Sequence, residues 1–216
     1  MMRRVAFAVL AAVICTSTAS AATTSTAPKP TARNNPFRTG RTLVIPHAGG
    51  EALYPENTLY AYKHSHALGG DVIDLDVQTT SVVAPICAIL KLLRREAISY
   101  VGIETSPQVN EFRRLCPAVH TSGTDEERTA MRAARDRGDT TFQTTVTVNQ
   151  PSYIGRDGKQ RITQAYLDFA HDRGIAVLTW VVDDPAIMRR LVAMGIDGIS
   201  TRRPDLLLPI VHPNGT

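Results

Sequence analysis

Short runs of β-branched and apolar residues alternate with longer amphipathic stretches between Thr42 and Ile210. This alternation is typical of a parallel sheet built from βα units. The strand-like runs cover residues 42–47, 71–77, 100–104, 119–122, 140–148, 176–182 and 198–201. The stretches between them predict helices at 57–68, 82–96, 108–115, 125–137, 163–172 and 185–194, before a short apolar piece at 204–210. No Gly-x-Gly-x-x-Gly follows the first run, so the pattern favours a (β/α) TIM-type barrel over a nucleotide-binding doubly wound sheet.

The predicted barrel is incomplete. A barrel of this class has eight strands and about 250 residues, whereas this segment supplies about seven strand-like runs in a shorter length. We therefore expect that one βα unit is missing and that two sheet edges are exposed unless another segment covers them.

The amino-terminal residues have the character of an export signal. Two arginines lie within Met1–Arg4, Val5–Cys15 is an unbroken apolar run, and Ala19–Ala21 has the small-x-small pattern of a cleavage site. A lipid anchor on Cys15 is a weaker alternative, because isoleucine precedes it. We expect a secreted or cell-envelope protein whose mature chain has no transmembrane segment. The predicted parts are a signal peptide at 1–21, a flexible Thr/Ser/Ala/Pro-rich tether at 22–41, the barrel domain at 42–210 and a tail at 211–216.

The net charge limits the classes of binding partner, and the two cysteines of the mature chain raise the question of a disulfide. The formal net charge is only +4, and loss of Arg3 and Arg4 with the signal would lower it further. This argues against nucleic acid and against an anionic membrane surface as partners. Cys87 and Cys116 remain after processing, and an oxidising compartment permits a disulfide between them. Two separate buried thiols are the alternative, and the spacing matches no zinc site.

Candidate catalytic side chains come at the ends of the first two predicted strands. His47 ends the first, and Asp74 and Asp76 share one face of the second. The carboxyl ends of barrel strands gather around one mouth. Two carboxylates there would suit Mg²⁺ or Ca²⁺, and an imidazole would transfer a proton, which together suit metal-assisted phosphodiester cleavage. Taken singly, the histidine could be a structural group and the aspartates loop caps.

The order of these motifs is more specific than any one of them. IPHAGGEALYPENTLYAYKHSHALGGDVIDLDVQTT (residues 45–80) combines His-x-Gly-Gly, Pro-Glu-Asn-Thr at a helix start and Asp-x-Asp. AHDRGIAVLTWVVDDPAIMRRLVAMGIDGISTRRPDLL (residues 170–207) adds a tryptophan-bearing strand and a closing Gly-x-Asp-Gly-Ile-x-Thr-x-x-Pro. Together they resemble the glycerophosphodiester phosphodiesterase family from Leu43 to Leu208.

The resemblance implies a phosphoric diester hydrolase that converts small glycerophosphodiesters to glycerol 3-phosphate and an alcohol with a divalent cation. His47 would be the first catalytic histidine and Glu56 a catalytic, active-site glutamate. Asp74 and Asp76 would be the metal-binding pair, and Trp180 would contact substrate at the mouth.

The chain departs from the family pattern in ways that predict impaired activity. Ala48 stands where an arginine is usual, and Arg202 where an aspartate is common. After Thr80 the segment with the second catalytic histidine is missing, as is the strand that carries a third metal carboxylate and a lysine. Glu104 is a candidate replacement for that carboxylate. The alternative function is a non-catalytic exported barrel that binds phosphoesters or a partner.

Overall fold

The structure is a computed structural model that describes residues 35–74, 83–102 and 106–214. Its strands are β1 (Leu43–Pro46), β2 (Tyr100–Val101), β3 (His120–Thr121), β4 (Val148–Asn149), β5 (Ala176–Thr179) and β6 (Gly198–Thr201). Its α-helices are α1 (Leu59–Leu68), α2 (Val83–Leu92), α3 (Ser106–Leu115), α4 (Asp125–Asp136), α5 (Gln164–His171), α6 (Pro185–Ala193) and α7 (Pro204–Val211). Short 3-10 turns cover His47–Gly49 and Glu96–Ile98.

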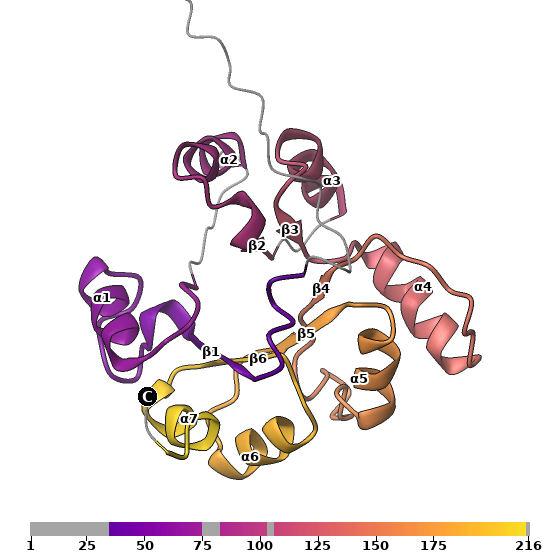
Figure 1. Ribbon diagram of the computed structural model, residues 1–216. Coiled ribbons are helices and arrows are strands. Elements are labelled where there is room, and N and C mark those ends of the chain that lie inside the picture. Colours follow the sequence, from indigo (N-terminus) through magenta and orange to yellow (C-terminus); the bar gives the residue numbers. More distant parts are fainter. Residues whose placement is uncertain (1–34, 75–82, 103–105, 215–216) are drawn as a thin grey trace, which may run out of the picture.

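The strands form two parallel groups. A four-stranded sheet has the order β1-β6-β5-β4, and β2 pairs with β3 in a two-stranded sheet. Helices α4, α5, α6, α7 and α1 follow one another around the larger sheet, and α2 and α3 lie beside the smaller one (Figure 1). The first and last strands pair directly, with Pro46 opposite Thr201, which is how a barrel closes.

Two polar contacts connect the sheets on the other side. The Tyr100 hydroxyl donates to the Gln150 side-chain oxygen at 2.9 Å, and a ring nitrogen of His120 lies 2.9 Å from the Thr147 hydroxyl. Burial raises the pKa of Tyr100 and lowers that of His120, so both stay neutral hydrogen-bonding groups at physiological pH. These contacts place β2 and β3 on the β4 side of the larger sheet.

The predicted strand at 71–77 is not regular where it is described. Residues 71–74 form no strand, and 75–77 lie outside the described residues. Asp71 nevertheless covers the free edge of β1: its N–H donates to the Val44 carbonyl, and its carboxylate accepts from the Val44 N–H, each at 2.9 Å. Arg41 holds this carboxylate by a hydrogen bond of 2.8 Å. A side chain thus satisfies a strand-edge group that would otherwise be exposed.

The start of the folded domain also differs from prediction. Residues 35–41 were expected to belong to a flexible tether, but Asn35 and Phe37 are buried. The Asn35 amide donates to the carbonyls of Thr147 and Gly174, at 2.6 and 2.9 Å. Phe37 packs among side chains of β1, β4 and β5 and lies edge-on to Tyr100. The folded domain therefore includes residues from Asn35 onward, because one aromatic side chain fills space inside the barrel.

One predicted strand is much shorter than expected. The run at 140–148 is regular only from Val148, because the threonine-rich residues before 146 are mostly exposed and Thr141 hydrogen-bonds the Asp139 side chain in a turn. Burial begins at Val146, and the strand follows it. High β-propensity without burial does not form a strand here.

Helix α2 packs on α3, in a small core that also includes Val101 of β2. Cys87 and Cys116 are both buried and form a disulfide, which decides between the two alternatives for these residues. Phe112 and Val119 join them in a small separate core. The disulfide therefore fixes the two helices beside the smaller sheet.

Removing this disulfide should destabilise the domain. We expect the double variant Cys87→Ser/Cys116→Ser to lose roughly 3–4 kcal/mol of unfolding free energy, the cost typical for opening a loop of about this length. Urea unfolding of the variant and of the reduced wild type measures it, and the two should agree. Unfolding midpoints equal to that of the oxidised wild type would contradict a structural role.

Candidate functional site

The turn after β1 presents His47 at the carboxyl end of the sheet. The Gly50 N–H donates to the His47 carbonyl at 2.7 Å, and Ala48, Gly49 and Gly50 all have left-handed φ angles, of 48°, 88° and 83°. A β-carbon on Gly49 would lie 2.7 Å from the β-carbon of Ala61 in α1. The diglycine therefore allows the left-handed turn and the close packing of α1 against it.

The Pro-Glu-Asn-Thr segment fastens this turn to α1. Thr58 is the helix N-cap, and its hydroxyl accepts from the Ala61 N–H at 3.1 Å. Asn57 does not cap the helix, because it has a left-handed φ of 54° and its N–H instead donates to the Ala48 carbonyl at 2.8 Å. Its side chain accepts from the Tyr62 hydroxyl. Asn57 therefore holds the backbone that carries His47.

The His47 imidazole is half-buried beside a carboxylate that sequence reasoning missed. Its Nδ1 lies 3.5 Å from Oε1 of Glu51, four residues later. That separation allows an ion pair when the ring is protonated but is long for a hydrogen bond, so Nδ1 has no hydrogen-bond partner among the described residues. The same Glu51 oxygen lies 3.8 Å from Nε of Arg202. One carboxylate thus separates the imidazole from a guanidinium.

Arg202 is held by a second carboxylate on the loop after β5. Asp183 accepts from the Arg202 backbone N–H at 2.9 Å, from its Nε at 2.6 Å and from the Thr201 hydroxyl at 3.0 Å. Burial opposes ionisation of Asp183, but these hydrogen bonds outweigh it and lower its pKa. Asp183 is therefore ionised at neutral pH and fixes the guanidinium.

The predicted metal pair is described only in part. The half-buried Asp74 carboxylate accepts from the hydroxyl of Ser200, a fully buried residue of β6, at 3.1 Å. Its side chain therefore turns toward the carboxyl end of β6, the same strand that pairs with β1 just before His47. Asp76 and the candidate Glu104 lie outside the described residues.

The described residues do not on their own make a divalent-cation site. In the ranges 35–74, 83–102 and 106–214, no three His, Cys, Asp or Glu side chains converge closely enough to hold a metal. Asp74 alone cannot supply the several oxygen ligands that Mg²⁺ or Ca²⁺ requires. The role of Asp74 and Asp76 as metal ligands remains a prediction.

Glu56 and Trp180 both lie near the mouth. Glu56 is exposed, and its carboxylate has no hydrogen bond or ion pair with any described residue. Trp180 follows β5, is 49% exposed, and donates from its indole N–H to the Gln150 carbonyl at 3.1 Å. The Gln150 side chain is the one that accepts from Tyr100, so the indole is fixed where β4 and β5 end. An exposed, oriented aromatic ring is suited to contact with a ligand, and the catalytic and substrate roles predicted for these two residues remain predictions.

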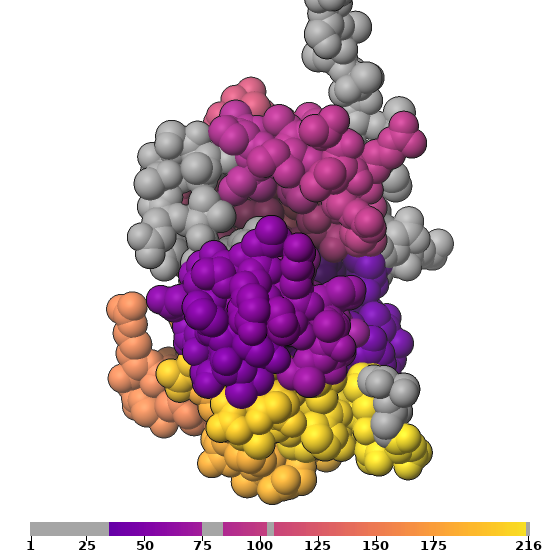
Figure 2. Space-filling model, turned by 90° about the vertical axis from the view of Figure 1, so that its left-hand side faces the viewer, coloured from indigo at the N-terminus to yellow at the C-terminus, as the bar shows by residue number. Residues whose placement is uncertain are grey.

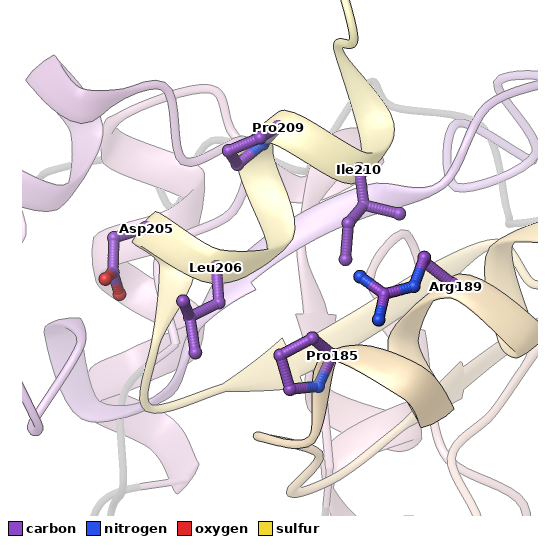
Figure 3. Close-up of a pocket in the computed structure, with 6 residues that line it drawn as sticks. All are labelled: Pro185, Arg189, Asp205, Leu206, Pro209 and Ile210. Atoms are coloured by element: carbon purple, nitrogen blue, oxygen red, sulfur yellow. The ribbon is translucent and has the colours of Figure 1, made fainter.

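Two pockets are formed by residues of the described ranges. The first, of about 590 Å³, lies between α6 and α7 and is lined by Pro185, Arg189, Asp205, Leu206, Pro209 and Ile210 (Figure 3). It contains no predicted site residue. The second, of about 530 Å³, is lined by Glu51, Ala52, Tyr54, Pro55, Glu56, Asp183, Arg202 and Arg203. The second pocket is the better candidate for the functional site, because it contains Glu51, Asp183 and Arg202, the charged residues close to His47. In Figure 2 the segment of α1 and its preceding turn lies between α2 and α7.

Parallel strands that close onto each other, an outer layer of helices and polar side chains at the carboxyl ends define an α/β barrel with its candidate site at the mouth. The model of the glycerophosphoryl diester phosphodiesterase family matches residues 47–88 and 93–206. The chain belongs to this family.

Curated relatives match shorter stretches. "Probable glycerophosphodiester phosphodiesterase 2" of Mycobacterium tuberculosis is 40% identical over 68 residues, which are 32% of this chain and 25% of that protein. A glycerophosphodiester phosphodiesterase of Caldanaerobacter subterraneus is 52% identical over 40 residues, 18% of this chain and 16% of that protein. The matches thus span a quarter or less of these relatives' own length.

Solved structures share the fold. A protein of Silicibacter pomeroyi described as a glycerophosphoryl diester phosphodiesterase has a TM-score of 0.65 at 16% identity, covering 85% of this chain and 98% of its own. A glycerophosphodiester phosphodiesterase of Agrobacterium tumefaciens has a TM-score of 0.60 at 13% identity, covering 77% and 99%. These similarities confirm the predicted TIM-type barrel class. Among the residues that the structure describes, six strands are present.

Proposed function

We propose that this protein hydrolyses small glycerophosphodiesters to glycerol 3-phosphate and an alcohol, at the mouth formed by the carboxyl ends of β1, β5 and β6. The observation that carries the proposal is the position of His47: a half-buried imidazole beside Glu51, at the end of the first strand of a barrel of this family. An imidazole exchanges protons near neutral pH, which phosphodiester cleavage requires.

The other proposed roles follow the same geometry. Glu56 borders the pocket, its carboxylate unpaired by any residue that the structure describes, and Trp180 presents an exposed indole for the alcohol moiety. We propose that Mg²⁺ or Ca²⁺ is needed, with Asp74 and Asp76 as ligands; when bound, such an ion would neutralise charge on the phosphoryl oxygens. The cofactor proposal depends on the Asp-x-Asp spacing and on the inward direction of Asp74.

We also propose that the activity is weak and that the protein acts after export. The segment missing after Thr80 would supply one proton-transfer group, and loss of such a group typically lowers the rate by about 10²–10⁴-fold. The export proposal rests on two observations. The amino-terminal sequence resembles an export signal, and the Cys87–Cys116 disulfide is of a kind typical of oxidising compartments. No helix among the described residues is long and apolar enough to cross a bilayer.

A single assay tests the function. Purified protein is incubated with glycerophosphocholine, with Mg²⁺, with Ca²⁺ or with EDTA, and glycerol 3-phosphate release is measured. We expect slow release that EDTA abolishes. Release unaffected by EDTA would contradict the metal proposal. No release under any condition would contradict hydrolysis and favour the alternative of a non-catalytic barrel that binds phosphoesters.

A further inference from the structure

Arg202 has unused hydrogen-bonding capacity in the pocket beside His47. Its Nε donates to an oxygen of Asp183 at 2.6 Å, and its Nη2 lies 2.5 Å from the same oxygen. Asp183 therefore occupies the edge of the planar guanidinium that is formed by Nε and Nη2. Nη1 has no protein partner within the described ranges, and the side chain is 52% exposed. The two terminal nitrogens of a guanidinium held in this way still present donors along their outer edge.

The place of Arg202 in the fold is one where barrels bind phosphate. The loops after the last two strands of a TIM-type barrel frequently form a phosphate site. Here Asp183 lies on the loop after β5 and Arg202 on the loop after β6, and both line the pocket of about 530 Å³. Glu51 connects this arginine to the imidazole, since its Oε1 is 3.8 Å from Arg202 Nε and 3.5 Å from His47 Nδ1. These distances place Arg202 and His47 on the same side of the mouth, with the Glu51 carboxylate between them.

The neighbouring charges favour a singly charged ligand. Glu51, Glu56 and Asp183 border the pocket with Arg202 and Arg203, and Arg203 is itself paired with Asp205 at 2.7 Å. A dianion would meet more repulsion from these carboxylates than a monoanion. A phosphodiester carries one negative charge, whereas glycerol 3-phosphate carries nearly two at neutral pH.

We propose that Arg202, positioned by Asp183, is the residue that binds the phosphodiester oxygens, and that the surrounding carboxylates select the diester over the monoester product. This inference rests on the proposed function for the identity of the site. It adds a specificity determinant at a position that the sequence had shown only as a departure from the family pattern. Guanidinium binding of phosphate is bidentate and geometric, so lysine should not replace it.

The test measures binding without turnover. The full chain, labelled with ¹⁵N and kept in EDTA, is titrated with diethyl phosphate. The Arg202 Nε–H resonance is followed in the wild type, and the backbone amide resonances of pocket residues Ala52 and Arg203 are followed in every variant. We expect a saturable shift in the wild type, about tenfold weaker binding in Arg202→Ala, and weaker binding in Arg202→Lys as well. Arg132→Ala, which removes an exposed arginine of α4, is the matched control and should bind like the wild type. Glycerol 3-phosphate should bind more weakly than diethyl phosphate.

Several results would overturn the inference. They are an unsaturable shift in the wild type, unchanged affinity in Arg202→Ala or Arg202→Lys, and tighter binding of glycerol 3-phosphate than of the diester. Thermal unfolding of each variant identifies loss of fold, and the wild-type resonance reports on Arg202 without any substitution. Because no metal or turnover is involved, a silent hydrolysis assay would leave this binding result intact. Turnover by the wild type with no effect of Arg202 on binding would refute only the inference.

Discussion

Replacing His47 with alanine is expected to lower kcat/KM for glycerophosphocholine by about 10²–10⁴-fold, the usual contribution of one proton-transfer group. The imidazole lies at the end of β1, with Glu51 beside Nδ1, so the opposite ring nitrogen is the one available to a substrate. Removing the ring should leave the turn intact, because the hydrogen bond from Gly50 uses the His47 backbone carbonyl. Steady-state release of glycerol 3-phosphate by both proteins measures the effect.

His66→Ala provides the matched control. His66 is an exposed residue of α1 in the same part of the chain, so its loss changes histidine content without touching the mouth. We expect its kcat/KM to stay within about twofold of the wild type, as for most surface substitutions. If the two variants retain similar activity, His47 is not the catalytic group, and any observed hydrolysis must be assigned elsewhere.

Phe37→Ala should be strongly destabilising, by about 3–5 kcal/mol of unfolding free energy. The ring is only 4% exposed and packs against Leu43, Val148 and Leu178 of three strands. It also lies edge-on to His120, with ring centroids 5.4 Å apart. Its removal would leave a cavity where the larger and smaller sheets meet, which the surrounding strands cannot readily fill.

Chemical denaturation of Phe37→Ala against Thr39→Ala measures this loss. Thr39 is exposed in the same segment, and its hydroxyl donates only to the Arg41 carbonyl nearby. We expect a change within about 0.5 kcal/mol for this control. Equal and small effects of both substitutions would mean that residues 35–41 belong to a flexible tether and not to the cooperative fold.

The parts of the fold that could be predicted are those whose neighbouring residues already indicate which positions are buried. The strand at 198–201 was predicted with its observed bounds, because Gly-Ile-Ser-Thr is fully buried between two helices with clear ends. The run at 140–148 misled, since threonines raise β-propensity whether or not they are buried. Phe37 could not be assigned to the core from its polar surroundings. Its burial depends on strands more than a hundred residues away.

The candidate site likewise contains residues that could be predicted from the sequence and residues that could not. His47 was found because strand ends gather at a barrel mouth, and that rule needs only the order of elements. The contact between Asp183 and Arg202 joins two loops and depends on the pairing of β5 with β6. Glu51 contacts His47 only because three consecutive residues adopt left-handed angles. Such backbone conformations are not encoded by periodicity, although the diglycine signals that one is possible.

The way Asp71 covers the edge of β1 makes the barrel sensitive to acid. Hydrogen bonds from Arg41 and Val44 outweigh burial and lower the pKa of Asp71, so the ionised form stabilises the fold. This contribution is present above the pKa of the unfolded chain and is lost as pH falls through the lower folded value. A neighbouring strand would satisfy that edge with peptide groups, which do not titrate. The contact between Asp71 and the edge of β1 therefore weakens in strongly acidic surroundings, where a contact made by peptide groups alone would not.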